Sequence, residues 1–122
     1  MTEERNTLGK RGEEFAADFL IKKGYKIKER NYKSALGEID IIALNGTTIV
    51  FIEVKTRTSL IFGRPFEAVT KKKQRQISKT ALYYMSTKKI GETAARFDIV
   101  SVISKGEKME AELIENAFEV AF

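Results

Sequence analysis

The alternation of apolar and polar residues predicts a helix near the amino terminus. Apolar residues recur there at helical spacing as far as Leu20. The helix is expected to begin near Asn6 or Thr7, either of which can cap it, and to end before Gly24. Gly9 and Gly12 are poor helix formers in its early turns, so we expect another backbone or a ligand to approach closely there.

Most of the remaining apolar residues fall in short runs that are typical of strands. Asn45-Gly46 lies between two such runs and is the strongest hairpin signal in the chain. Strands are expected over 25–32, 38–44, 48–56, 95–103 and 109–117, with a flexible segment over 57–65 and a second helix over 66–88. The order α-β-β-β-α-β-β predicts a single α/β domain over residues 1–122, in which helices flank a mixed sheet.

Charged residues interrupt the central hairpin, where a buried strand should be apolar. Asp40 lies among isoleucines in the first strand, and Glu53 and Lys55 alternate with apolar residues in the second. A buried carboxylate is costly unless it is paired or binds a metal. A two-residue loop would place Glu38 opposite Glu53, with Asp40 diagonal to it. A four-residue loop would place Asp40 directly opposite Glu53. In both registers Asp40, Glu53 and Lys55 share one face of the sheet, whereas a three-residue loop would separate them.

Two carboxylates and an ammonium on one sheet face suit phosphodiester hydrolysis. Mg²⁺ and Mn²⁺ prefer a few carboxylates together with water and substrate phosphate. A neighbouring ammonium such as that of Lys55 can orient or help deprotonate the attacking water and balance developing negative charge. The alternative interpretation is a ladder of salt bridges on a solvent-exposed sheet face, and the spacing alone leaves both open.

The absence of cysteine and histidine narrows the chemistry. It excludes disulfides, thiol nucleophiles, zinc fingers, Ser-His-Asp triads and imidazole metal sites. An active site must therefore use carboxylates, Lys, Arg, Tyr, hydroxyls and hard metal ions. The missing cysteines agree with a reducing compartment. No segment resembles a signal peptide or a membrane span of about 18 apolar residues, so we expect a soluble, cytoplasmic protein without a membrane partner.

Positive charge is concentrated in the predicted second helix. The chain carries a net charge of +5, and residues 71–89 hold seven basic residues and no acidic one. They are Lys71, Lys72, Lys73, Arg75, Lys79, Lys88 and Lys89. Outside this run, acidic residues outnumber basic ones. Such asymmetry favours a polyanion-binding face, and a solvated helix surface is the alternative.

Several motifs resemble those of a known family. Asp40 followed by Glu53-Val54-Lys55 resembles the Asp…Glu-x-Lys signature of the PD-(D/E)xK nuclease superfamily, although Ile39 rather than proline precedes Asp40. The surrounding motifs resemble the YraN family, bacterial proteins proposed to be endonucleases and distantly similar to archaeal Holliday junction resolvases. In chain order they are Gly12-Glu13, Asn31-Tyr32, 37–43, 50–57 and 97–100.

The resemblance implies a restriction-endonuclease-like fold and a role for each matched residue. Asp40 and Glu53 would be ligands of Mg²⁺ or Mn²⁺, and Glu13 would join them from the first helix. Lys55 would be the catalytic lysine. Glu13 could equally be an ordinary first-turn glutamate favoured by the helix dipole. Glu38 could support the ligands through hydrogen bonds or simply be solvated.

Basic residues near this site are candidates for binding nucleic acid, with surface or solvated positions as the alternative. They are Arg57, Arg64, Lys71, Lys72, Lys73 and Arg75.

We therefore expect a metal-dependent endonuclease that hydrolyses phosphodiester bonds in DNA, including branched or recombination and repair intermediates. The alternative is a nucleic-acid-binding module of the same fold without cleavage activity of its own. A homodimer would suit the resemblance, because related resolvases cut two strands.

Overall fold

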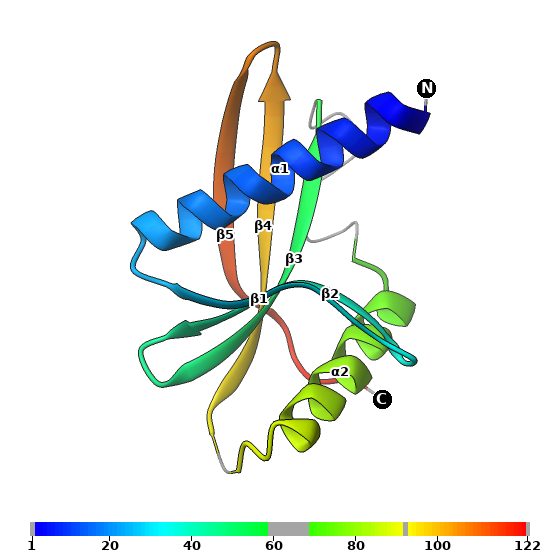
Figure 1. Cartoon of the computed structure of the whole chain (residues 1–122), viewed down its shortest axis with the longest axis vertical. Coiled ribbons are helices and arrows are strands. Elements are labelled where there is room, and N and C mark those ends of the chain that lie inside the picture. Colours follow the sequence, from blue (N-terminus) through cyan, green and yellow to red (C-terminus); the bar gives the residue numbers. More distant parts are fainter. Residues whose placement is uncertain (1, 59–68, 92, 122) are drawn as a thin grey trace.

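The elements of the computed structural model follow the predicted order, and the structure describes residues 2–58, 69–91 and 93–121 (Figure 1). They are α1 (Thr2–Lys22), β1 (Lys26–Ser34), β2 (Gly37–Asn45), β3 (Thr48–Arg57), α2 (Lys71–Thr87), β4 (Ala95–Lys105) and β5 (Lys108–Phe118). The helix α1 begins at Thr2, earlier than the expected start near Asn6 or Thr7.

The second helix begins later than the expected 66. Thr70 is its N-cap, and the Thr70 side chain accepts a hydrogen bond of 3.1 Å from the backbone N–H of Lys73. Val69, which was expected on the helix, precedes it and is nevertheless buried. Most of the segment 57–65, predicted to be flexible, lies outside the described residues. No helix in the described part of the chain is long and apolar enough to cross a membrane.

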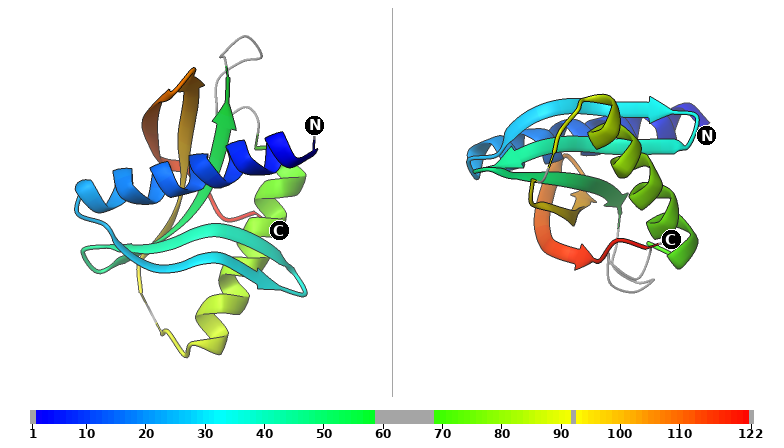
Figure 2. Two further views of the ribbon diagram at one scale, coloured as in Figure 1. Left: turned by 45° about the horizontal axis from the view of Figure 1, so that its top comes forward. Right: turned by 90° about the horizontal axis from the view of Figure 1, so that it is seen from below.

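Five strands form one mixed sheet in the order β1-β2-β3-β4-β5. Neighbouring strands are antiparallel except β3 and β4, which are parallel and are joined through α2. Figure 1 shows α1 crossing β3, β4 and β5, whereas Figure 2 shows α2 beside the hairpin of β1 and β2. A five-stranded mixed sheet flanked by two helices is the predicted architecture, and it is consistent with a restriction-endonuclease-like fold.

The two helices bury opposite faces of the sheet. On the α1 side, Leu20 packs in a cluster with Ile41 and Ile52. On the α2 side, Ile77 packs in a separate cluster with Phe51. Each cluster removes a continuous apolar surface from water, which is the main stabilising contribution to such a fold.

The close approach expected at Gly9 and Gly12 is found at Gly12 alone, which allows α1 to pack directly against β3, whereas a Cβ atom on Gly9 would meet nothing within 4 Å. A Cβ atom on Gly12 would lie 2.0 Å from Oγ1 of Thr56, well inside van der Waals contact. The next residue of α1 is Glu13, so this close approach brings a predicted site residue to the sheet.

The central hairpin adopts the register that places Asp40 opposite Glu53. Asn45 pairs with Thr48, and Ile41 pairs with Ile52. The turn residues are therefore Gly46 and Thr47, one residue later than the expected Asn45-Gly46. Gly46 has a φ of 63°, a left-handed conformation that glycine adopts without strain.

Candidate active site

The strands β2 and β3 separate at Asp40. Their pairing ends at Ile41 and Ile52. The backbone N–H of Val54, which would continue the ladder, instead donates a 2.8 Å hydrogen bond to Oδ2 of Asp40. Beyond this point β2 stays paired with β1 and β3 stays paired with β4, so the sheet forks (Figure 2). Asp40 thus marks the point at which the two strands part.

Glu53 faces Asp40 across this fork and is 8% exposed. Burial raises the pKa of Glu53 to about 8, and the hydrogen bond to Asp40 and the negative charge of Asp40 contribute to this rise. The positive charges of Lys73 and Lys55 act in the opposite direction. Glu53 therefore holds its proton up to about pH 8, because burial and the neighbouring carboxyl group disfavour its charged form.

Two lysines approach the carboxyl pair from different elements. Nζ of Lys73, in the first turn of α2, lies 3.7 Å from Oε2 of Glu53. Lys55 lies two residues after Glu53 on the same face of β3 and lowers the pKa of Glu53 through its charge. Sequence reasoning placed Lys73 in the basic run but not beside Glu53, because no local pattern reveals how α2 docks on the sheet.

Glu13 of α1 lies at the edge of the same site. Burial raises the pKa of Glu13, followed by the negative charge of Asp40, while Arg30 and a hydrogen bond from Asn31 lower it. In the β1–β2 register, Asn31 lies opposite Asp40 between the pairs Arg30–Ile41 and Tyr32–Ile39. Asn31 therefore lies on β1 opposite Asp40 and hydrogen-bonds to Glu13 of α1.

Asn31 is a site residue that sequence reasoning named only within a motif. Its φ of 53° is left-handed, a conformation that few residue types other than glycine and asparagine accept. The sequence offered one signal for Asn31: asparagine is depleted in strands, yet this one lies inside a predicted strand of charged residues.

The donor set fits a hard divalent ion with a small number of protein ligands. Within residues 2–58, 69–91 and 93–121, no group of three or more Asp or Glu side chains is arranged to hold a metal ion. Mg²⁺ nevertheless commonly takes one or two carboxylates and completes its shell with water and substrate phosphate. Asp40 and Glu53 match that requirement, and the role of Glu13 as a third ligand stays a prediction.

The other predicted residues are more dispersed. Glu38 is exposed, and its carboxylate lies 4.0 Å from Nζ of Lys33 in a surface ion pair. Arg57 is half-buried at the end of β3. Arg64 lies outside the described residues. Of the residues predicted to bind nucleic acid, Lys71, Lys72 and Arg75 are exposed on α2.

A second buried carboxylate, Asp98 of β4, has a different environment. Asp98 is 0% exposed and accepts hydrogen bonds from Nε of Arg96 at 3.0 Å and from the backbone N–H of Asn116 at 2.9 Å. The Tyr25 hydroxyl lies 3.5 Å from Oδ2 of Asp98 and also accepts a hydrogen bond from Arg96. The hydrogen bonds from Arg96 to Asp98 raise the pKa of Arg96. These partners give Asp98 a structural role, in which it joins β4 to the start of β1 and to β5.

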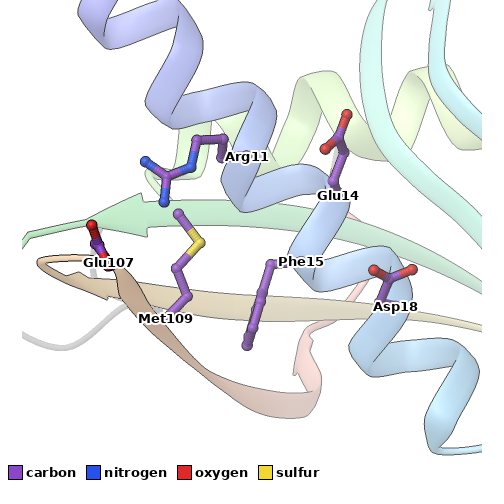
Figure 3. Close-up of a pocket in the computed structure, with 6 residues that line it drawn as sticks. All are labelled: Arg11, Glu14, Phe15, Asp18, Glu107 and Met109. Atoms are coloured by element: carbon purple, nitrogen blue, oxygen red, sulfur yellow. The ribbon is translucent and has the colours of Figure 1, made fainter.

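Two cavities lie elsewhere on the surface. Figure 3 shows one of about 290 Å³, lined from α1 and from the β4–β5 turn, with Arg11, Phe15 and Met109 among its residues. The other, of about 490 Å³, is largely apolar and lies between α2 and the ends of β4 and β5. Neither of these two cavities, which are lined by described residues, contains Asp40, Glu53 or Lys55.

The fold and the site together define an α/β protein of restriction-endonuclease-like architecture with a carboxyl pair at a strand fork. The chain belongs to the uncharacterised protein family UPF0102, whose sequence profile matches residues 12–102. It is 48% identical to a UPF0102 protein of Geobacter metallireducens over the full length of both chains. It is 50% identical to one of Syntrophus aciditrophicus over 100% of this chain and 95% of the relative. Identity to one of Dictyoglomus thermophilum is 52%, over 91% of this chain and 96% of the relative.

Proposed function

We propose that this protein is a metal-dependent endonuclease of the PD-(D/E)xK type that hydrolyses phosphodiester bonds in DNA, including branched intermediates. The observation that carries the proposal is the Asp40–Glu53 pair. A buried glutamate is held against another carboxyl group, and Lys73 contacts it only at 3.7 Å. Such an arrangement is unfavourable for a purely structural role and is relieved by a divalent cation.

Asp40 and Glu53 would hold Mg²⁺ or Mn²⁺ at the fork. When bound, the ion would polarise the scissile phosphate and stabilise negative charge on the leaving oxygen. The protein's own contribution is the rigid placement of the two carboxylates, because Asp40 is fixed by the N–H of Val54 and Glu53 by its strand. Lys55 would orient the attacking water and balance the charge that develops on the phosphate.

The basic face of α2 would bind the nucleic-acid backbone. The ion pair between Lys73 and Glu53 places the first turn of α2 at the carboxyl pair. Lys71, Lys72 and Arg75 lie on the same helix, and α2 has no acidic residue in its first turn. A phosphate chain attracted to these cations and to the amino-terminal end of the helix dipole would pass the fork.

A nucleic-acid-binding module without turnover is the second candidate. The observation that favours it is the Lys73–Glu53 ion pair, which already supplies Glu53 with a cation. In such a module the positive charges around the fork would hold phosphate, and no metal would be required.

A cleavage panel tests the proposal. Branched, flapped, duplex and single-stranded DNA would be incubated with Mg²⁺ or Mn²⁺ and the wild-type protein, Lys55→Ala, Glu53→Gln or Glu112→Gln. Glu112 is an exposed carboxylate on β5 and serves as the matched control for loss of charge. We expect metal-dependent cutting by wild type and Glu112→Gln, and a loss of about a hundredfold or more in the other two.

Two outcomes would contradict it. Cleavage that survives in Glu53→Gln would exclude the fork as the catalytic centre. Salt-sensitive DNA binding without cutting under any metal condition would favour the binding module.

A further inference from the structure

One buried hydroxyl on the α2 side of the sheet has no partner. Ser101 of β4 is 2% exposed, and its Oγ makes no hydrogen bond within the described part of the chain. An unsatisfied buried hydroxyl costs about 1–3 kcal/mol. The buried side chains of Ser78 and Thr80, by contrast, are hydrogen-bonded to backbone atoms. Ser101 is therefore an exception that calls for a physical explanation.

The sheet register places Ser101 beside Lys55. The strands β3 and β4 are parallel, and Ser101 is the partner of Lys55 in their ladder. Paired residues project from the same face of a sheet, so both side chains lie on the face that carries Glu53. On the other side, Ser101 is paired with Glu112 of β5, whose exposed carboxylate is surrounded by water. Lys55 is thus the neighbouring polar residue with which the buried hydroxyl of Ser101 can form a hydrogen bond.

The surroundings of Lys55 change if a divalent ion binds. Without metal, the Lys55 ammonium acts on the carboxyl group of Glu53. With a divalent cation on Asp40 and Glu53, the ammonium faces another positive charge and has to turn toward a neutral acceptor. A serine hydroxyl can accept a hydrogen bond without adding charge.

We propose that Ser101 is a positioning residue for Lys55, and that its hydroxyl accepts a hydrogen bond from the Lys55 ammonium when the fork holds a divalent ion. This inference rests on the proposed function, since it assigns the metal to Asp40 and Glu53. Because the hydroxyl has no other partner among the described residues, it offers the ammonium a fixed place beside the loaded site. A fixed ammonium can face the attacking water, whereas a free lysine side chain would sample many rotamers.

The first test observes the ammonium itself and needs no cleavage. Protein labelled with ¹⁵N-lysine would be titrated with Mg²⁺ alone, and the Lys55 ammonium resonance would be assigned by its loss in Lys55→Arg. We expect Mg²⁺ to slow the exchange of its protons with water in the wild type. Ser101→Ala and Ser101→Cys should both abolish this protection, because a thiol of similar size is a poor acceptor.

Ser104→Ala is the matched control. Ser104 is a buried serine on the same strand, three residues further on and therefore on the other sheet face. This variant should retain the protected ammonium. Metal-free Ser101→Ala should melt at the wild-type temperature or higher, since it removes an unsatisfied hydroxyl.

The second test uses the cleavage assay. Ser101→Ala should lower kcat by about ten- to a hundredfold, the worth of a charge-assisted hydrogen bond, and leave KM for DNA unchanged. Wild-type rates in Ser101→Ala, or an ammonium resonance unaffected by the substitution, would overturn the inference. If the wild type cuts no substrate, the proposed function fails, and the ammonium resonance with Mg²⁺ still decides whether Ser101 holds Lys55.

Discussion

The sheet contains two buried acidic centres, and they are built in opposite ways. At Asp98, a fully buried carboxylate is matched by the guanidinium of Arg96 and by the N–H of Asn116. At the fork, Glu53 faces another carboxyl group, Asp40, and its pKa is raised to about 8. The first centre is complete without any added group, whereas the second is electrostatically incomplete.

Whether a buried carboxylate is matched by a cation distinguishes a structural site from a functional one more clearly than its burial does. A matched buried ion pair contributes to a unique fold, and it has no capacity left for a ligand. A pair of facing carboxyl groups destabilises the metal-free protein and keeps acceptor oxygens available. Strongly perturbed carboxyl groups of this kind are typical of sites that bind cations or transfer protons.

Replacing the aspartate by asparagine should change the free energy of unfolding in opposite directions at the two centres. These are the largest effects that we expect. Asp98→Asn should lower the free energy of unfolding by about 3 kcal/mol, because it leaves the guanidinium of Arg96 without its counter-ion. Above about pH 8, where Glu53 is also ionised, Asp40→Asn should preserve or raise the stability of the metal-free protein, because it removes one of two repelling charges and keeps an oxygen for the N–H of Val54. Urea unfolding at about pH 9 measures both.

A control for the first centre is Glu115→Gln. Glu115 lies 3.8 Å from Arg96, but its side chain is 59% exposed, so the reduction in unfolding free energy should stay within about 1 kcal/mol. Equal destabilisation by the two asparagine substitutions would show that both centres are structural.

The sequence predicts the Asp40–Glu53 pair better than it predicts the partners of Asp98. Asp40 and Glu53 follow from hairpin parity, since two of three loop lengths place them on one face. The partners of Asp98 are distant in the chain: Tyr25 lies just after α1, and Asn116 lies at an irregular point of β5. Lys73 reaches Glu53 only through the docking of α2. Pairings of this kind depend on tertiary packing, which local patterns do not encode.

A dependence of stability on pH should follow from the raised pKa of Glu53. Because its folded pKa, about 8, exceeds the ordinary value of 4.5, the folded protein binds a proton that the unfolded chain has lost between these values. The contribution of Glu53 to stability is therefore fully present below about pH 4.5, falls as the pH rises, and is lost above about pH 8. Urea unfolding of metal-free wild type and Glu53→Gln across this range measures the fall in the free energy of unfolding. The fall should be smaller in the variant, in which the raised pKa of Glu13 remains.

Glu112→Gln should retain the wild-type slope, since its carboxylate is exposed. A Glu53→Gln curve parallel to that of the wild type would mean that Glu53 is ionised throughout, and the fork would resemble an ordinary ion pair.

Divalent ions should change the free energy of unfolding by a smaller amount. Mg²⁺ at ten times its dissociation constant should stabilise the wild type by about 1.4 kcal/mol, because it binds only the folded state. Asp40→Asn should lose most of this increment. Differential scanning calorimetry with Mg²⁺ or Mn²⁺ measures it, and an equal increment in Asp40→Asn would place the ion elsewhere.

Neutralising the basic face of α2 should change DNA binding and leave the carboxyl pair untouched. Lys71→Gln with Lys72→Gln should weaken DNA binding and reduce the salt slope by about one for each of these lysines that binds a phosphate. Because the two lysines lie on the outer side of α2, the metal-induced stabilisation should be unchanged. Fluorescence anisotropy at several salt concentrations measures the slope, and an unaltered slope would identify the run as a solvated helix face.

From the contrast between the two centres we expect a divalent ion to bind at the fork and not at the Asp98 centre. Paramagnetic Mn²⁺ distinguishes them, because it broadens the ¹H–¹⁵N resonances of nearby backbone amides. Substoichiometric Mn²⁺ should broaden the amides of Val54 and Asp40 more strongly than those of Asp98 and Asn116, because Asp98 is the β4 partner of Ile52 and still lies within range of the ion. Asp40→Asn should remove the effect. Sharp resonances at Val54 under saturating Mn²⁺, or broadening that persists in Asp40→Asn, would show that the fork is not the metal site.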